Sequence, residues 1–127
     1  MNKEQLLPFE KLHVWHLAKD FARRIYGVTR EFPTSERFGL TSQINRAAVS
    51  VMSNVAEGSA RTSRRDQAHF SQLAYSSLME VACQLQLALE IELCSLAAYE
   101  ELRLSIHELS AKLNALHRSQ LNALKDR

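Results

Sequence analysis

The chain has little of what interrupts regular secondary structure: its 127 residues include three Gly and two Pro. Because these two residue types mark most tight turns, a chain so poor in them has few and long elements. Leu, Ala, Glu, Gln and Arg are common instead, and all five favour helices. The composition therefore favours an all-α protein, and its length suffices for one domain with a sizeable core.

The chain has few cysteines and no long apolar run, and both features narrow the possible classes of protein further. Cys83 and Cys94 fall in one expected helix, where their spacing corresponds to about 16 Å, beyond the reach of a disulfide. We expect two buried thiols, which suits a reducing compartment. The N-terminal segment has no apolar signal core, and no run approaches the roughly 18 apolar residues of a membrane helix. These absences predict a cytoplasmic protein without a membrane span.

The chain also lacks a large excess of charge of one sign. Its net charge of +2 is weak evidence for a polyanionic partner, and its charged fraction of 24% excludes wholesale disorder. The charges are unevenly placed, because residues 1–65 hold eleven Lys and Arg against six Asp and Glu, whereas residues 66–127 hold five against eight. Such asymmetry permits a basic surface without requiring one.

Apolar residues recur at helical spacing in four stretches, which three short breaks separate. The expected helices cover residues 9–31, 35–58, 63–93 and 96–120. Four amphipathic helices of this length, joined by short turns, predict an antiparallel up-down-up-down four-helix bundle that makes residues 1–127 a single domain. The expected core stripes are Val14, Ala18, Phe21, Ile25, Val28 and Phe32; Leu40, Ile44, Ala47, Val51 and Val55; Ala74, Leu78, Val81, Leu85 and Leu89; and Tyr99, Leu102, Ile106, Leu109, Leu113 and Leu116.

The breaks between these stretches carry helix-ending and helix-starting residues. Pro33 ends the first helix, because a proline pushes the residue before it out of the α region. Gly58 is expected to end the second helix as its C′ glycine, a position where glycine takes a positive φ at no steric cost. Ser63 and Ser95 are expected to cap the third and fourth helices. Residues after Gln120 are expected to fray.

The end of the third expected helix contains the one ambiguous pattern. Residues 85–93 alternate Leu or Ile with Gln, Ala or Glu, which is typical of a strand. A helix is the better interpretation, because the interleaved residues favour helices, only Ile91 is β-branched and no other segment offers a partner strand.

As a helix, this passage is apolar on two sides. One side continues the core stripe, and the roughly opposite side holds Cys83, Leu87, Ile91 and Cys94. A bundle helix needs one core stripe, so the second face predicts burial against another subunit. Alternatively, the third helix is central in its own bundle and its two neighbours cover both sides.

A polar stripe runs along the second expected helix. It comprises Gln43, Arg46, Ser50, Asn54 and Glu57, at steps of three and four residues. One interpretation is a buried or interfacial polar network that sets the register between helices or subunits. The alternative is a solvated outer face, although such faces usually carry more charge.

Patterns that would indicate catalysis or a metal are weak. Glu10 and His13 form an E-x-x-H pair with His16 nearby, and Asp66 and His69 form a looser one. Di-iron bundles place such pairs in mid-bundle, whereas these pairs lie in the first turns of their helices. No nucleophile and base signature, phosphate loop or dinucleotide motif accompanies them. We expect no enzymatic activity, no small-molecule substrate, no cofactor and no metal site.

Arginines gather around the expected turn between the second and third helices. Arg61, Arg64 and Arg65 flank that turn, and Arg23 and Arg24 lie on the first helix. Arginines at a helix start can hold phosphates, helped by the free N–H groups there. These five residues form the candidate nucleic-acid-binding set, and a solvated loop is the alternative. A symmetric oligomer would repeat the loop around its axis and turn a modest patch into a ring.

Two segments resemble a known protein family. The first extends from Phe32-Pro33 through Gln43-Ile44-x-Arg46-Ala47-Ala48-Val49-Ser50 to Ser53-Asn54-Val55-Ala56-Glu57-Gly58, and the second is Ser77-Leu78-x-Glu80. They are similar to the four-helix-bundle proteins named for intervening sequences in 23S ribosomal RNA genes. That family is similar in fold to the accessory variability determinant of diversity-generating retroelements. The resemblance covers nearly the whole chain and departs at Met52, where the family pattern often has Pro.

The resemblance implies an up-down bundle, a homopentamer and no enzymatic activity. The retroelement relative is a basic, nucleic-acid-binding pentamer that partners a reverse transcriptase, which makes RNA or DNA the expected partner. We therefore expect a homo-oligomeric, nucleic-acid-associated scaffold. The alternative is a protein–protein adaptor with no nucleic-acid role, whose second apolar face receives a partner helix.

Overall fold

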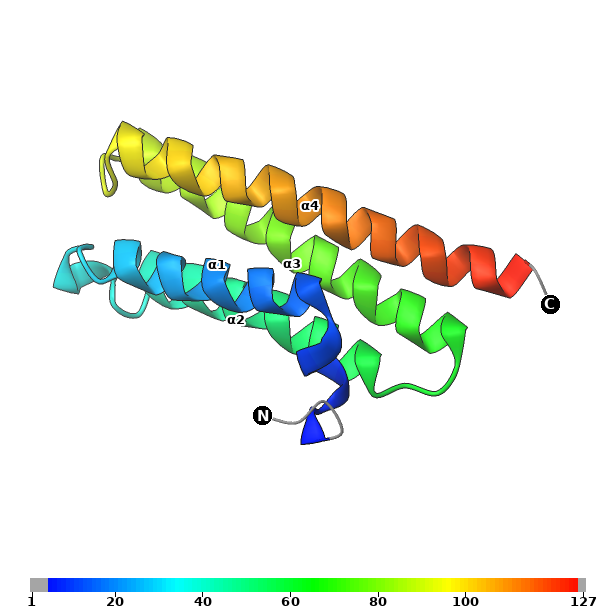
Figure 1. Cartoon of the computed structure of the whole chain (residues 1–127). Helices are drawn as coiled ribbons and strands as arrows, with labels where there is room; N and C mark the ends of the chain where they lie inside the picture. The colour runs from blue at the N-terminus through cyan, green and yellow to red at the C-terminus, as the bar shows by residue number, and fades with distance from the viewer. Residues whose placement is uncertain (1–4, 126–127) are drawn as a thin grey trace.

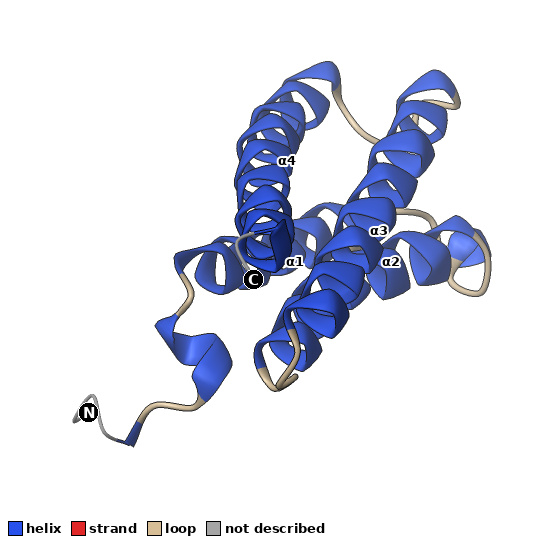
Figure 2. Ribbon diagram, turned by 90° about the vertical axis from the view of Figure 1, so that its right-hand side faces the viewer, coloured by secondary structure: helices blue, strands red, loops and turns tan. Residues whose placement is uncertain are grey.

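The computed structural model describes residues 5–125, and the regular structure within them is helical throughout, as Figure 2 shows. Four α-helices make up the fold: α1 (His13–Thr29), α2 (Leu40–Ser59), α3 (Arg64–Glu90) and α4 (Leu96–Lys125). Two short 3-10 helices complete it, η2 (Pro8–Lys11) before α1 and η3 (Thr34–Glu36) before α2. The expected all-α fold is confirmed, and so is the helical interpretation of the alternating passage as far as Glu90.

Successive helices run up and down, so that each packs against its neighbours in sequence and α4 returns to α1 (Figure 1). This arrangement gives the bundle two different ends. The α1–α2 and α3–α4 turns lie at one, which we call the two-turn end. The α2–α3 turn lies at the other, the one-turn end, together with η2 and the last turns of α4.

The core consists mainly of the apolar stripes that the helical spacing predicts, but at the end of α3 the buried residue is Ala88, and the expected core residue Leu89 is only partly buried. Because residues three and four apart share a face of a helix, each helix offers one continuous stripe to the bundle axis. The largest fully buried side chains are Phe21 and Ile25 of α1, Ile44 and Val51 of α2, Leu78, Val81 and Leu85 of α3, and Leu109 and Leu113 of α4. At about 25 cal/mol per Å² of buried apolar surface, this shared core is the main source of stability.

The helix boundaries differ from the expected ones at several places. Residues 8–11 form η2 and turn away from α1, so that α1 begins at His13 instead of residue 9. The second helix begins at Leu40 instead of residue 35, because η3 occupies the start of that segment. There the Glu36 carboxylate accepts a hydrogen bond from the Leu40 N–H (3.2 Å), which satisfies one of the free donors of the first turn of α2. At the other extreme, α4 continues past Gln120 to Lys125.

The third helix ends at Glu90 instead of residue 93 because its C-terminus closes in a Schellman motif. The Leu93 N–H donates to the Ala88 carbonyl (2.8 Å) and the Glu92 N–H to the Leu89 carbonyl (3.1 Å). This geometry requires a left-handed residue, and Glu92 supplies it with φ 61°. Ile91 therefore lies at the cap of α3, outside its regular turns.

Gly58 has a different role from the expected one. It lies within α2, and no glycine among the described residues has a positive φ. A Cβ built on Gly58 would stand 2.9 Å from the Cβ of Phe70 on α3. Glycine is required here because α2 and α3 approach each other closely, and the flexibility of its backbone is not used. The expected caps are confirmed: Ser63 Oγ accepts from the Asp66 N–H (3.1 Å) and Ser95 Oγ from the Ala98 N–H (3.1 Å).

The cysteines are less buried than expected. Cys83 is exposed on α3, whereas Cys94 is partly buried in the α3–α4 turn, where burial raises the pKa of its thiol. Both thiols are free. The expectation of two buried thiols is thus wrong for Cys83, which lies on the side of α3 that faces away from the core.

Candidate nucleic-acid interface and the groove between α2 and α3

The three loop arginines lie together at the one-turn end, and all three are exposed. The Arg61 guanidinium stacks over the Phe70 ring, 4.6 Å from its centroid. Arg64 Nη1 donates to Gln67 Oε1 (3.1 Å), and Gln67 Nε2 donates in turn to the Arg61 carbonyl (2.8 Å). Within residues 5–125 none of these arginines forms an ion pair with a carboxylate. The turn is therefore ordered by neutral partners while its positive charges stay available.

The two arginines of α1 are placed differently. Arg23 and Arg24 both bind Asp20, at 2.7 and 3.0 Å. The hydrogen bond from Arg23 and then the positive charges of both arginines lower the pKa of the Asp20 carboxyl, against the opposing effect of burial. Arg24 Nη1 also donates to Ser105 Oγ on α4 (3.2 Å). These two side chains are thus engaged within the bundle, and they do not join the loop arginines of the α2–α3 turn.

The polar stripe of α2 is partly a network and partly a solvated face. Ser50 Oγ lies 2.9 Å from Ser77 Oγ on α3, and Asn54 Nδ2 donates both to the Ser50 carbonyl (2.8 Å) and to its Oγ (3.0 Å). Gln43 Oε1 accepts from Gln84 Nε2 across the same interface (3.3 Å). The stripe therefore joins α2 to α3 at two levels, whereas Arg46 and Glu57 are exposed.

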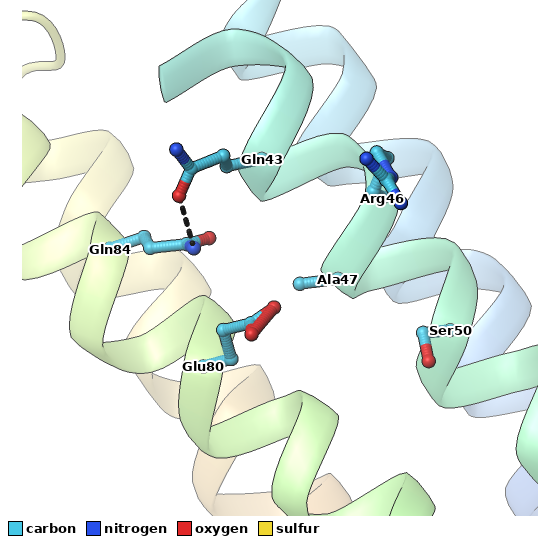
Figure 3. A pocket seen from close by; sticks show the side chains of 6 residues that line it. All are labelled: Gln43, Arg46, Ala47, Ser50, Glu80 and Gln84. Carbon is cyan, nitrogen blue, oxygen red and sulfur yellow. Dashed lines mark hydrogen bonds between the residues drawn. The ribbon is translucent and has the colours of Figure 1, made fainter. Parts of the chain in front are cut away.

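Between these two levels lies a shallow groove of about 330 Å³. Its lining residues are Gln43, Arg46, Ala47, Ser50, Glu80 and Gln84 (Figure 3). In Figure 3 the Glu80 carboxylate points from α3 across the groove toward Ala47, and no ion pair joins it to Arg46 among the described residues. Gln84 Oε1 is buried there without a hydrogen-bond partner. The groove thus unites the two segments that carry the family resemblance.

Gln84 was not among the candidate residues predicted from the sequence, although its spacing from other polar residues indicates a role. Ser77, Glu80 and Gln84 are spaced by three and four residues along α3, and Ser50, Arg46 and Gln43 are spaced by four and three in the opposite direction along α2, so the ends of both stripes are seven residues apart. Two polar stripes of equal length on consecutive antiparallel helices indicate that the stripes face each other.

The candidate oligomer face is largely outside the core. Leu87 is 50% exposed and Ile91 48% exposed, and Cys83 is exposed beside them. The alternative that neighbouring helices cover this side of α3 is therefore wrong for these residues. Cys94 differs, because it packs against the core of its own bundle. Phe38, 90% exposed in the α1–α2 segment, and Leu96, 58% exposed, add apolar surface at the same two-turn end.

The weak metal-ligand patterns do not converge. His16 Nε2 lies 2.8 Å from the Glu10 carbonyl, so its ring contacts the backbone of η2. In the part of the chain that the structure describes, no three His, Cys, Asp or Glu side chains group as metal ligands do.

Residues 10–115 match the sequence pattern of the 23S rRNA-intervening sequence protein family. The chain belongs to this family. Among solved structures, a protein of unknown function from the S23 ribosomal protein family of Bacteroides thetaiotaomicron has the same fold, with a TM-score of 0.77 and 23% sequence identity. The similarity covers 83% of this chain and 95% of that one. None of the curated proteins with which the chain was compared matches it.

Family membership confirms the resemblance carried by the two segments of α2 and α3. The departure at Met52 leaves α2 continuous, because the non-proline residue keeps its N–H in the helical ladder. No helix within residues 5–125 combines the length and apolarity that a membrane span requires.

Proposed function

We propose that the protein is a non-enzymatic, homo-oligomeric scaffold that binds RNA through the loop arginines Arg61, Arg64 and Arg65, in the cytoplasm. The observation that carries the proposal is the state of these three side chains. They are exposed, gathered at one turn and free of ion pairs within the described chain. Guanidinium groups in this state bind phosphate in charge-assisted, often bidentate hydrogen bonds. The family description, which refers to 23S rRNA, supports RNA as the polyanion.

Assembly would increase the number of phosphate contacts, which are few in a single subunit. A net charge of +2 gives a single subunit little attraction for RNA, and three arginines are few phosphate contacts. The exposed apolar side chains at the two-turn end support burial against further copies. A symmetric oligomer, a pentamer by analogy with the relatives, would present several loops to one RNA molecule, and linked sites raise affinity without any new contact.

The test is a salt titration of the binding of a labelled single-stranded RNA to the intact protein. We expect binding to weaken as salt rises, and the Arg61→Ala/Arg64→Ala/Arg65→Ala variant to bind at least tenfold more weakly. The logarithmic salt dependence should also flatten by about 0.7 for each phosphate that the variant no longer binds.

The matched control removes three exposed cationic side chains elsewhere, as Lys19→Ala/Arg30→Ala/Lys112→Ala. This variant has the same net charge as the loop variant. If the two variants bind equally weakly, the attraction is a property of total charge and the loop is not the site. If the loop variant binds as the unchanged protein does, the proposal is wrong.

The adaptor function makes the opposite prediction. An adaptor would show no salt-dependent RNA binding at all, and its exposed Leu87 would contact a different protein instead of another copy. A monomer in light scattering that binds no RNA would favour this function over the scaffold.

A further inference from the structure

A second groove, of about 300 Å³, lies between α3 and α4. Its polar and aromatic lining residues are Tyr75, Gln86, Tyr99, Arg103, His107 and Ser110. Its apolar floor includes Met79 and Ile106. None of the residues that line it is Asp or Glu, although the second half of the chain is acidic overall.

The lining has the chemistry of a nucleotide site. Two phenol rings beside an apolar floor suit a flat group with a π face, and bases stack on such rings with little regard to sequence. Gln86 and Ser110 can hydrogen-bond to a base edge, and Arg103 can contact a phosphate or stack on the base. Tyr99 Oη accepts a hydrogen bond from Arg103 Nη1 (2.9 Å), which holds the guanidinium beside the aromatic ring.

The groove is aligned with the loop arginines. Tyr75 follows Arg64 by eleven residues in α3, which places the two on nearly the same line of the helix and about 16 Å apart. On α4, the residues Tyr99, Arg103, His107, Ser110, Asn114 and His117 step by four or three and include no carboxylate. His117 Nδ1 lies 3.0 Å from the Ala68 carbonyl, so this stripe reaches the first turns of α3 beside the loop.

We infer that the α3–α4 groove stacks the bases of a single-stranded nucleic acid whose phosphates contact the loop arginines at the one-turn end. The inference rests on the proposed function and adds a base-contacting site to it. The ligand is single-stranded because bases within a duplex are stacked on one another and do not present their faces.

The experiment compares Tyr75→Ala and Tyr99→Ala with the unchanged protein, using the same labelled single-stranded RNA. We expect each variant to bind about 5- to 100-fold more weakly, as is typical when one stacking ring is removed. The salt dependence should stay unchanged, because the arginines still bind the same number of phosphates. Tyr75→Phe keeps the ring and should bind as the unchanged protein does, whereas Tyr99→Phe, which loses the hydrogen bond from Arg103 but keeps its ring, should lose less affinity than Tyr99→Ala. Tyr26→Ala, which removes the exposed tyrosine of α1, is the matched control and should have no effect.

Replacing a partly buried tyrosine by alanine can also disturb the fold, so a second variant changes an exposed residue of the groove. His107→Glu introduces a carboxylate into the groove at an exposed position of α4, and we expect at least a tenfold loss of binding. His13→Glu makes the same change at an exposed position of α1 and should bind normally. An abasic strand has a sugar-phosphate backbone of the same length as the RNA but no bases. It should bind the unchanged protein only as weakly as the RNA binds the tyrosine variants.

The outcomes of these experiments distinguish a wrong inference about the groove from a wrong proposed function. If the alanine variants and His107→Glu bind RNA normally while the loop variant is weakened, the groove is not a base site and the loop function stands. If the phenylalanine variants lose as much affinity as the alanine variants, stacking is wrong. If the unchanged protein shows no salt-dependent RNA binding, the proposed function fails and the groove with it.

Discussion

The two ends of the bundle differ in what they expose. The two-turn end carries apolar side chains that a lone bundle leaves in water, among them Phe38, Ile91 and Leu96. The one-turn end carries the three loop arginines on an ordered turn. An up-down bundle brings the α1–α2 and α3–α4 turns together at one end, so segments more than 50 residues apart in sequence form one surface.

This difference leads us to propose that assembly and RNA binding use separate surfaces. Burial of exposed apolar area favours association of proteins, whereas unpaired guanidinium groups favour a polyanion. Substitutions at one end should therefore leave the property of the other end intact, although affinity for RNA will fall when fewer loops act together.

The largest expected effect follows from a charge at the apolar end. Leu87→Glu places a carboxylate on the half-exposed face of α3, where another subunit would have to desolvate it. We expect the assembly to dissociate to folded monomers, measured by light scattering together with circular dichroism. Leu121→Glu is the control, because Leu121 is similarly exposed but lies at the one-turn end, and it should stay assembled. An assembly unchanged by Leu87→Glu would show that this face is not the interface.

An intermediate effect is expected from a methyl group at the contact between α2 and α3. Gly58→Ala would bring a Cβ within 2.9 Å of the Phe70 Cβ, which cannot rotate away, so the helices must separate. Overpacking of this kind costs about 1–3 kcal/mol, against about 1 kcal/mol gained from alanine in a helix. We expect a lower free energy of unfolding in urea.

The control for this substitution is Gly27→Ala on α1, where a Cβ meets nothing within 4 Å. That variant should be more stable by up to about 1 kcal/mol, since alanine is the better helix former. Equal effects of the two substitutions would show that packing against Phe70 is unimportant.

The smallest expected effect lies in the α3–α4 turn. Glu92 takes a left-handed conformation with φ 61°, which glycine adopts without a steric penalty. Glu92→Gly should therefore raise the free energy of unfolding by roughly 0.5–1 kcal/mol, less the added entropy of the unfolded chain. Glu90→Gly, within the last turn of α3, should lower it by up to about 1 kcal/mol. If both variants shift the midpoint of thermal unfolding in the same direction, the left-handed conformation of Glu92 does not reduce stability.

Much of the fold could be predicted because helical spacing is a local property. The stripes of Val14 to Ile25, Ile44 to Val55 and Leu102 to Leu113 are the stripes that line the core. Helix ends were predicted less well. The Schellman closure has Glu92 instead of a glycine at its left-handed position, so no residue type marked it in the sequence. Pro33 and Gly39 do flank the segment before Leu40, but Pro33 was interpreted only as the end of the first helix, and the 3-10 helix that follows it was not predicted.

Site residues were predicted unevenly for a related reason. Arg61, Arg64 and Arg65 are close in sequence and so remain close in the fold, whereas Arg23 and Arg24 pair with Asp20, one turn away on their own helix. An i,i+3 or i,i+4 ion pair is readable from sequence, and it removes these two arginines from the unpaired set. The residues of the α3–α4 groove come from two helices, and their convergence depends on how those helices pack.

The sequence by itself determined that the protein is a helical bundle, because periodicity and the scarcity of Gly and Pro act within each segment. It also separated two apolar faces of α3, although only the exposure of Leu87 in the structure decided that the second face lies outside the core. Only the tertiary structure decided that Gly58 serves close packing, that Glu80 and Gln84 share a groove with Gln43, and that the two ends expose different chemistry. These features depend on distances between helices, which no local pattern of residues contains.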